Sequence, residues 1–401
     1  MRVLVLAQYF PPDIGGGSTR AFNVAKGLRE KGCVVRVVTA FPHYPLGRIP
    51  SRYKGKALVF EKIEDIEITR VWIPALPHNS LVNRIILHIC FIFSSLFALP
   101  FEGEVDVVFA ANPNLFSFFS ALIYSFANRK PIVRNVDDLW PEVFYDAGLV
   151  KSGFLKKIID IITWASYSVP VALTPISHAY IPKIIERYRI REEKIRTIEV
   201  GVDTTFFNKT YTHAKEKSDF VVMYSGILGS GYDFDTVLRA AKLLSSNKRI
   251  SFIIRGVGER QREIRDMIKK LNLRNVVLST DLVPKIELVQ VLGSADVFLL
   301  PMGGAGSADD GLPTKIFEYQ ALGKPIICCS RGEPARYIAS TKSGLVVDIK
   351  DPDALADAIL KLQKDEETAL ELGLNGWKHI QQYLTVEKIG EHMYNLFISF
   401  I

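Results

Sequence analysis

Cysteine is scarce in this sequence of 401 residues, and the few thiols follow no recognisable pattern. No two of them are spaced as a CxxC pair, and each lies in an apolar run typical of a strand or a helix; they are Cys33, Cys90, Cys328 and Cys329. A disulfide framework is therefore not indicated, and we expect buried free thiols in a reducing compartment.

Other absences narrow the class of protein. The sequence has no low-complexity tract and no long block of like charges, so a disordered tail is not expected. The apolar start, MRVLVLAQYF, is far too short for a signal peptide and predicts a first strand. No nucleic-acid motif is recognisable and no glycine loop matches the strict GxGxxG fingerprint, so nucleic acid and nicotinamide cofactors are both disfavoured.

The composition that is present is that of a folded globular chain, with 48% apolar and 23% charged residues. A chain of this length is too long for one compact core and suits two domains. The formal net charge of +7 favours anionic partners, such as phosphorylated ligands or an anionic membrane surface.

Two similar strand–turn–helix–strand units predict two α/β domains of the same kind. In the first unit, the glycine turn Gly15-Gly16-Gly17 precedes the helix, and a glycine loop stands at the same place in the second. The predicted strands cover 1–7 and 33–40 in the first unit, and 220–226 and 249–258 in the second. Between the units, the polar region near 200–220 breaks both periodicities and is the expected joint.

Parallel sheets bind ligands at the carboxyl ends of their strands, so the two domains are expected to face each other across a cleft. Both glycine loops would then open onto that cleft. Backbone amides near Gly16 and Gly17, at a helix N-terminus, suit a phosphate. The alternative is that these glycines only allow tight packing of strand against helix.

A third glycine loop, at 302–310, follows a predicted buried strand and precedes a short helix that begins near Thr314. Amides around Leu312 and Thr314 can accept an anion, and Lys315 adds a positive charge beside them. Glu318 lies about one turn further along the same face, where a carboxylate can accept hydrogen bonds from ribose hydroxyls. This pattern fits a nucleoside diphosphate, although a simple surface pair of Lys315 and Glu318 is an equal alternative.

The segment around Gly311-Leu312-Pro313 resembles the signature of the retaining glycosyltransferases of family 4, which have the GT-B fold. That signature places two acidic residues eight positions apart, which here are Asp310 and Glu318; the family usually has Glu at the first. The resemblance implies that Asp310 contacts the donor sugar and that Glu318 holds the ribose. Further similar segments cover most of the chain: 11–32, 200–207, 252–264 and 283–301.

Two segments, FPHYPLGRI and NVDDLWPEVFYDAGLV, are similar to the WbuB-like branch, whose members act in surface polysaccharide biosynthesis. The resemblance implies a metal-independent transfer from a nucleotide sugar, with UDP expected, to a lipid-linked or glycan acceptor, and no cofactor. The catalytic residues expected are Asp310, Asp138 and Lys315. The donor-binding residues expected are Gly16, Gly17, Gly226, Gly229, Arg255, Val283, Gly311, Leu312, Thr314 and Glu318.

This sequence departs from the family pattern at two places. The family carries an Arg and a Lys in the loop after the strand that ends at Gly226, whereas the loop here, ILGSGYD, has no basic residue. Amides at Gly229 to Gly231, or the charge of Arg255 or Lys315, are the expected substitutes. A histidine that other branches use for sugar contact is also missing from 110–120.

Two kinds of acidic motif need separate interpretations. Asp137 and Asp138 follow a predicted strand, and we expect them on the acceptor side of the cleft; the alternative is an N-cap or a surface pair. The triplets DFD (233–235) and DPD (351–353) imitate a DxD metal motif. Three-residue matches are common by chance, so no metal is assigned.

An apolar stretch at 85–101 has no charge unless His88 is protonated, and it is slightly short for a transmembrane helix. We expect a helix lying in the membrane plane, with a buried core helix as the alternative. Basic residues upstream suit an anionic leaflet: Arg48, Arg52, Lys54, Lys56 and Arg84. The predicted location is cytoplasmic, at the inner face of the cell membrane.

The sequence therefore predicts an α/β protein with two Rossmann-like domains. The acceptor-binding domain is expected over 1–203, the nucleotide-sugar domain over 204–380, and a C-terminal helix at 381–401 that crosses back to the first domain. Two other functions stay open: a nucleotide-sugar epimerase of the same architecture and a non-catalytic nucleotide-sugar-binding protein.

Overall fold

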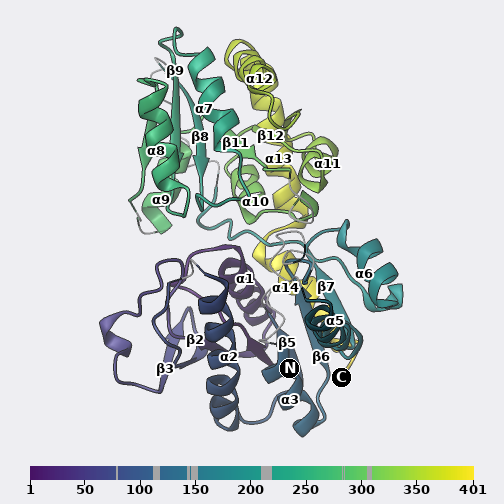
Figure 1. Ribbon diagram of the computed structural model, residues 1–401. Coiled ribbons are helices and arrows are strands. Elements are labelled where there is room, and N and C mark those ends of the chain that lie inside the picture. The colour runs from purple at the N-terminus through teal and green to yellow at the C-terminus, as the bar shows by residue number, and fades with distance from the viewer. Residues whose placement is uncertain are drawn as a thin grey trace. The chain divides into compact units, whose positions relative to one another are not determined.

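The computed structural model describes residues 1–77, 80–111, 118–141, 145, 152–208, 219–281, 283, 285–304 and 309–401. The chain forms two compact units (Figure 1). The N-terminal unit contains Met1–Gly201 together with Val386–Ile401, and the C-terminal unit contains Val202–Thr385. Both are α/β units in which helices cover a mainly parallel sheet, as expected from the sequence.

The N-terminal unit is built on a seven-stranded sheet in the order β3-β4-β2-β1-β5-β6-β7. All pairs are parallel except β3 with β4. The inner strands are near-continuous runs of buried Val, Ile and Leu, as expected for a sheet covered on both faces. Their bounds are β1 Arg2–Leu6, β2 Val34–Ala40, β3 Leu58–Ile63, β4 Ile66–Val71, β5 Val107–Ala110, β6 Ile132–Val136 and β7 Ala172–Pro175.

Helices of the N-terminal unit connect these strands and pack on the sheet (Figure 1). They are α1 Gly16–Glu30, α2 Leu81–Ala98, α3 Phe118–Asn128, α5 Gly153–Ser168, α6 Tyr180–Tyr188 and α14 Val386–Ile398, with 3₁₀ turns η1 Ser51–Tyr53, η2 Leu99–Phe101 and η3 Glu192–Lys194.

The C-terminal unit has a six-stranded parallel sheet in the order β10-β9-β8-β11-β12-β13. The strands are β8 Phe220–Ser225, β9 Ile250–Arg255, β10 Val276–Ser279, β11 Val297–Pro301, β12 Ile326–Cys329 and β13 Gly344–Val347. The helices are α7 Phe234–Leu243, α8 Gln261–Lys270, α9 Lys285–Gly293, α10 Thr314–Ala321, α11 Glu333–Ser340, α12 Pro352–Lys364 and α13 Glu366–Tyr383.

Strand order reverses once near the middle of each parallel sheet. In the N-terminal unit the reversal lies between β1 and β5, and in the C-terminal unit between β8 and β11. Open α/β sheets bind ligands at such switch points, outside the carboxyl ends of the strands. The glycine turns at Gly15–Gly17, after β1, and at 226–231, after β8, each follow a strand at one of these points.

The end of the sequence returns to the N-terminal unit, as predicted. Helix α14 packs along α1, and the two backbones touch where Gly27 faces Gly390. A Cβ atom added to Gly27 would lie 2.4 Å from the Val386 carbonyl oxygen and 2.8 Å from the Gly390 Cα. Only glycine permits this approach. Met393 and Phe397 of α14 are also fully buried.

One minor sequence expectation needs correction. The thiols of Cys33, Cys328 and Cys329 are buried and free, as expected, but Cys90 is only half-buried. It lies on α2, whose outer face is exposed, so an apolar run did not imply complete burial there.

Candidate active site

The switch point of the C-terminal unit is lined by two loops packed backbone to backbone. Gly226 and Gly256 both have positive φ, at 152° and 141°. A Cβ atom on Gly256 would lie 1.7 Å from the Gly226 carbonyl oxygen, and one on Gly258 would lie 2.3 Å from the Leu228 carbonyl oxygen. The glycines after β8 and β9 are therefore required by close approach as well as by backbone conformation.

Helix α10 is fixed against the ends of β8 and β11 by Tyr319. The Tyr319 hydroxyl accepts a hydrogen bond from the Ser225 amide and donates one to the Ser225 carbonyl oxygen, both at 2.9 Å. Its ring stacks on Phe298 of β11, with centroids 3.8 Å apart. Lys315 lies one turn before Tyr319, so the same face of the helix points it at the end of β8.

The loop ILGSGYD after β8 has no basic residue, and Lys315 of α10 places a cation beside it. Its Nζ donates to the Tyr224 hydroxyl at 2.9 Å and lies 3.8 Å from the ring centroid of Tyr232. It also lies 2.7 Å from where a Cβ atom on Gly226 would stand. Burial lowers the pKa of the Lys315 ammonium to about 7, and the carboxylate of Glu318 partly opposes this shift.

The remaining predicted residues at the start of α10 lie around this lysine. Thr314 is the first helical residue, after Pro313 as N-cap, and no side chain caps the N-terminus. Gly311 and Glu318 are half-buried and Leu312 is buried. Asp310 is half-buried in the turn before them, whereas its neighbour Asp309 accepts a hydrogen bond from Ser330 at 2.7 Å. The part of the preceding loop at 305–308 lies outside the described residues.

The two other expected sources of phosphate contacts have different surroundings. The amide of Ser230, between Gly229 and Gly231, donates to the Glu259 carboxylate at 3.0 Å, so a side chain already occupies this donor. Arg255 is buried at the end of β9 and donates to the Asp281 carbonyl oxygen at 2.7 Å. Lys315 lies against Gly226 at the start of the glycine loop of β8, and Arg260 donates to the Tyr232 carbonyl oxygen near its end.

Val283, another residue expected to bind the donor, is half-buried between β10 and α9.

Both DxD triplets begin with helix N-caps. The Asp233 carboxylate accepts from the Thr236 amide at the start of α7, and the Asp351 carboxylate accepts from the Ala354 amide at the start of α12. Aspartate is a preferred N-cap residue because its oxygen accepts from an otherwise unpaired helix amide. The spacing of these carboxylates therefore has a local structural cause.

In the N-terminal unit, the glycine turn opens the first turn of α1. Gly15 is the N-cap with φ 145°, and no side chain bonds to the helix N-terminus. Gly16 is exposed and Gly17 half-buried, so their backbones are accessible at the switch point beside β1. An anion-binding role for Gly16 and Gly17 requires backbones that are accessible in this way. The side chains near this turn come from the loop after β2.

The structure separates the roles of the two adjacent aspartates after β6. Asp137 lies 3.2 Å from the guanidinium of Arg20, a fully buried side chain of α1 that also donates to Asn135 at 2.7 Å. Asp137 therefore neutralises a buried cation, and its role is structural. Asp138 is exposed. Of the pair, only Asp138 stays a candidate for contact with an acceptor.

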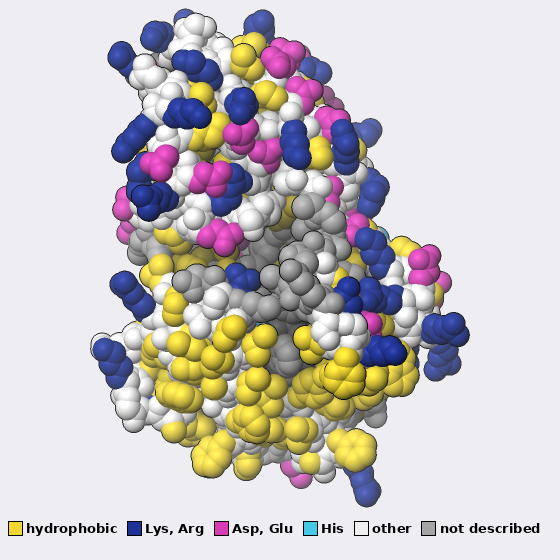
Figure 2. Space-filling view, viewed as in Figure 1, with side chains coloured by type: hydrophobic (Ala, Val, Ile, Leu, Met, Phe, Trp, Pro, Cys, Tyr) yellow, Lys and Arg dark blue, Asp and Glu magenta, His cyan; other side chains and the backbone are white. Residues whose placement is uncertain are grey.

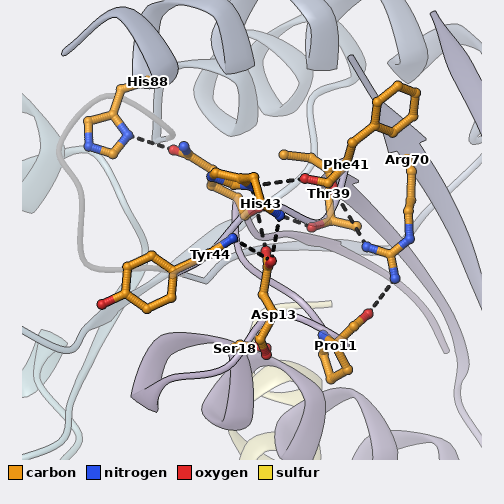
Figure 3. Close-up of polar contacts among 11 residues, drawn as sticks. Pro11, Asp13, Ser18, Thr39, Phe41, His43, Tyr44, Arg70 and His88 are labelled. Atoms are coloured by element: carbon orange, nitrogen blue, oxygen red, sulfur yellow. Dashed lines mark hydrogen bonds and ion pairs between the residues drawn. The ribbon is translucent and has the colours of Figure 1, made fainter. Parts of the chain in front are cut away.

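A buried polar cluster at the carboxyl ends of β1 and β2 was not predicted (Figure 3). Asp13 accepts hydrogen bonds from the amides of His43 and Tyr44, and Gln8 contacts His88 of α2 at 2.6 Å. The motifs PPDIGG and FPHYP contain Asp13, His43 and Tyr44, but the contacts among these three join segments some thirty residues apart. Sequence spacing gives no sign of such contacts.

The outer face of α2 forms part of a broad apolar surface. Among the described residues, one helical stretch, Val82–Phe101, is long and apolar enough to cross a membrane, and a third of it is buried. Leu87 and Phe91 face the core, whereas Phe93 and Phe97 are about 70% exposed. Figure 2 shows apolar side chains spread across this face of the N-terminal unit.

Exposed apolar residues on α3 and α5 extend that surface: Ile123, Phe126, Phe154, Leu155, Ile158, Ile161 and Trp164.

Comparison with protein families identifies both parts of the chain. Residues 14–206 match the family described as Glycosyltransferase Family 4, and residues 207–379 match the family described as Glycosyl transferases group 1. The solved structure of HepE from Anabaena in complex with UDP-glucose matches with a TM-score of 0.72 at 16% identity, covering 100% of both chains. At this identity the likeness shows the fold alone, which is GT-B.

Two curated relatives illustrate the range of similarity. The putative colanic acid biosynthesis glycosyltransferase WcaL of Escherichia coli K12 is 26% identical over 198 residues, which cover 48% of each chain. The match thus spans about half the length of that relative. The O-antigen chain mannosyltransferase C of Escherichia coli is 22% identical, over 100% of this chain and 99% of its own.

Proposed function

The chain belongs to the group 1 and family 4 glycosyltransferases, and we propose that it is a retaining, metal-independent hexosyltransferase. The donor is a nucleotide sugar, with UDP as the nucleotide. The acceptor is a lipid-linked intermediate or a glycan in surface polysaccharide biosynthesis. The observation that carries this proposal is the position of Lys315 against the glycine loop of β8, with Glu318 on the same short helix.

Lys315 and the amides around Leu312 and Thr314 bind the diphosphate in this proposal. As the bond from sugar to phosphate breaks, negative charge builds on the leaving diphosphate. A buried ammonium and oriented amides stabilise that charge without reorganisation, because they are already in place and little water surrounds them. The Tyr224 hydroxyl and the Tyr232 ring hold the Lys315 ammonium at the end of β8.

Glu318 accepts hydrogen bonds from the two ribose hydroxyls. It lies three residues after Lys315 on α10, and Tyr319 fixes the rotation of this helix through both of its bonds to Ser225. A rigid helix is a precise platform for such a contact. Asp310, in the turn before the helix, is assigned to the donor sugar.

The acceptor hydroxyl attacks from the face that the diphosphate leaves, so that the configuration at the anomeric carbon is retained. A phosphate oxygen takes the proton of this hydroxyl, and no protein nucleophile is needed. The exposed carboxylate of Asp138 is the group of the N-terminal unit assigned to this half of the reaction, whereas the accessible amides at Gly16 and Gly17 are assigned to the leaving diphosphate.

A thermal-shift screen against nucleoside diphosphates and their sugars tests the donor assignment. UDP and UDP-sugars are expected to raise the unfolding temperature of the wild type. Glu318→Ala should abolish most of that shift, because the ribose loses two hydrogen bonds to a carboxylate, about 2–4 kcal/mol of binding free energy. Asp357→Ala, which removes an exposed carboxylate of α12, is the matched control and should leave the shift unchanged.

An undiminished shift in Glu318→Ala would refute the ribose assignment. Turnover measurements then separate the possible reactions. A transferase consumes the donor in proportion to added acceptor, an epimerase converts it without one, and a binding protein leaves it intact.

We place the enzyme at the cytoplasmic face of the cell membrane, through the outer face of α2. Monomeric proteins rarely expose a continuous apolar surface of this kind without a binding role. Basic residues are exposed before the helix, at Arg48, Arg52, Lys54 and Lys56, and in its first turn, at Arg84. Lys156 and Lys157 lie among the apolar residues of α5. Apolar contacts flanked by cations suit an anionic leaflet, where a lipid-linked acceptor would be presented.

A further inference from the structure

Asp13 joins the two loops that follow β1 and β2. It stands two residues before Gly15, and its side chain is 1% exposed. Its Oδ1 accepts hydrogen bonds from the backbone amides of His43, at 2.7 Å, and Tyr44, at 2.8 Å (Figure 3). Because β1 and β2 are parallel neighbours, both loops leave the same edge of the sheet. One carboxylate therefore serves as a clamp between them.

The backbones of both loops are held from other directions as well. Ser18 of α1 donates to the Asp13 carbonyl oxygen at 2.8 Å. Arg70 of β4 donates to the carbonyl oxygens of Ala40, the last residue of β2, and Pro11, in the loop after β1. In Figure 3 the Arg70 guanidinium lies on the far side of the cluster from Tyr44. The two loops thus form one connected structure in which Asp13 supplies the charge-assisted bonds.

The ring nitrogens of His43 add a further constraint. Nδ1 lies 2.8 Å from the Phe41 carbonyl oxygen, which can only accept, so Nδ1 carries a hydrogen and donates. The second oxygen of Asp13, Oδ2, lies 3.7 Å from the same nitrogen. Within the described part of the chain, Oδ2 has no hydrogen bond. The His43 ring also stacks on Tyr9, with centroids 5.2 Å apart.

The clamp sets the position of Tyr44 beside the glycine turn. A Cβ atom on Gly15 would lie 3.2 Å from the Tyr44 ring, so this ring covers the N-cap of α1. Tyr9 meets Tyr44 edge to face at 5.3 Å. Gly16 and Gly17, whose amides are assigned to the leaving diphosphate, come directly after the covered residue.

We propose that Asp13 is a positioning residue for the transfer reaction: its carboxylate holds the His43–Tyr44 loop on the glycine turn and thereby fixes the Gly16 and Gly17 amides, which are assigned to the leaving diphosphate. This inference rests on the proposed function. Asp13 acts through the backbone and touches no substrate.

Burial raises the pKa of Asp13 to about 7, against the opposing effects of the amide bonds and of Arg70. The clamp therefore changes charge near neutral pH. The titratable and charged groups that face it are His43 and Tyr44 from the loop after β2, Tyr9 from the loop after β1, and Arg70 from β4. An ionised Asp13 accepts both amides more strongly than a protonated one.

Two substitutions separate the clamp from the charge. Asp13→Ala removes the acceptor of both amides, and we expect kcat to fall by about 10- to 100-fold. Most of the donor-induced thermal shift should stay, because Lys315 and Glu318 lie in the C-terminal unit. Asp13→Asn keeps a carbonyl oxygen at this position, so activity should remain within about threefold of wild type. At saturating donor, the rise of wild-type activity with pH up to about pH 7 should be absent in Asp13→Asn, whereas any fall above pH 7 that comes from Lys315 should remain.

Hydrogen exchange of the amides at 15–17 and 43–47 reads the clamp without any substrate. We expect faster exchange in Asp13→Ala than in Asp13→Asn, whereas a failure of the proposed function would appear as loss of the nucleotide-induced shift in the wild type. The inference is overturned if Asp13→Asn keeps the rise of activity up to about pH 7, or if exchange at these amides does not change in Asp13→Ala. Should Asp13→Ala fail to fold, the Asp13→Asn profile decides.

Discussion

At the residue scale, two buried ionisable side chains stand at the two glycine turns with opposite charges. Burial raises the pKa of Asp13 to about 7 and lowers that of Lys315 to about 7. The physical cause is the same, because removal of water disfavours the charged form of either group. Partners favour the charged form of each: two amides and Arg70 for Asp13, and the Tyr224 hydroxyl, the Tyr232 ring and Glu318 for Lys315.

Lys315 predicts a pH dependence of donor affinity. Only its ammonium form attracts a diphosphate, and that form is lost as pH rises through about 7 in the empty site. We expect the affinity for a UDP-sugar to fall about tenfold between pH 6.5 and 8.5. A UDP-sugar is the correct probe because its phosphates are diesters that do not titrate in this range.

The matched variant for this measurement is Lys315→Met, which keeps the length of the side chain without its charge. It should bind the donor weakly at every pH, with a flat profile by titration calorimetry. A wild-type profile that is equally flat would show that Lys315 does not contact the diphosphate.

Sequence reasoning could propose donor residues on α10 because the candidates lie within one short segment bounded by glycines. The spacing of Lys315 and Glu318 and the proline before the helix are local signals. Arg20 with Asp137, and Asp13 with His43, are contacts between distant segments. Asp137 and Asp138 looked equivalent in the sequence, and only the buried Arg20 distinguishes them.

At the element scale, the fixed orientation of α10 explains how so short a helix can present charges reliably. Eight residues form few helical hydrogen bonds, and isolated helices of this length are unstable. Tyr319 and Ile316 are fully buried, so tertiary contacts supply the stability that length does not. The position of this helix was predictable from its glycines and proline, and its rotation was not.

The crossing of α1 and α14 predicts a large effect of a small substitution. Gly390→Val places a side chain against the Gly27 backbone, where a Cβ atom alone would lie 2.3 Å from the carbonyl carbon and oxygen. We expect a loss of about 3 kcal/mol of unfolding free energy, because neither helix can move away without exposing Met393 and Phe397.

Denaturant titration of the N-terminal unit measures this loss. Asn395→Ala, on the exposed side of the same helix, should change the free energy of unfolding by less than about 0.5 kcal/mol. Equal effects of the two substitutions would mean that the helices do not pack at these glycines in solution.

At the scale of the whole molecule, length and repeated motifs predicted the fold class, since each strand–turn–helix signal is local. The strand orders β3-β4-β2-β1-β5-β6-β7 and β10-β9-β8-β11-β12-β13 needed the structure, because register between distant strands leaves no periodic trace. The apolar stretch at 85–101 was recognised, but its burial on one face and the matching surfaces of α3 and α5 were not.

The extended apolar surface predicts binding to lipid vesicles. The wild type is expected to sediment with vesicles rich in phosphatidylglycerol and less with neutral phosphatidylcholine. Replacing Phe93 and Phe97 with serine should reduce binding at least about tenfold, since two exposed aromatic side chains no longer enter the interface.

Leu370→Ser is the control for lost apolar area, because Leu370 is 64% exposed on α13 of the C-terminal unit. Its binding should match the wild type. Retention of full vesicle binding by the Phe93 and Phe97 variant would contradict a lipid role for α2.

The return of the chain at Val386 also has a consequence during synthesis. A ribosome completes all of the C-terminal unit before it makes α14, yet α14 packs along α1 of the N-terminal unit. At about 5–20 residues per second, the first half waits at least some ten seconds for its last piece. Until α14 is made, the surface of α1 that it covers stays exposed on the nascent chain, although the C-terminal unit is already complete. A chaperone would bind this surface during that interval.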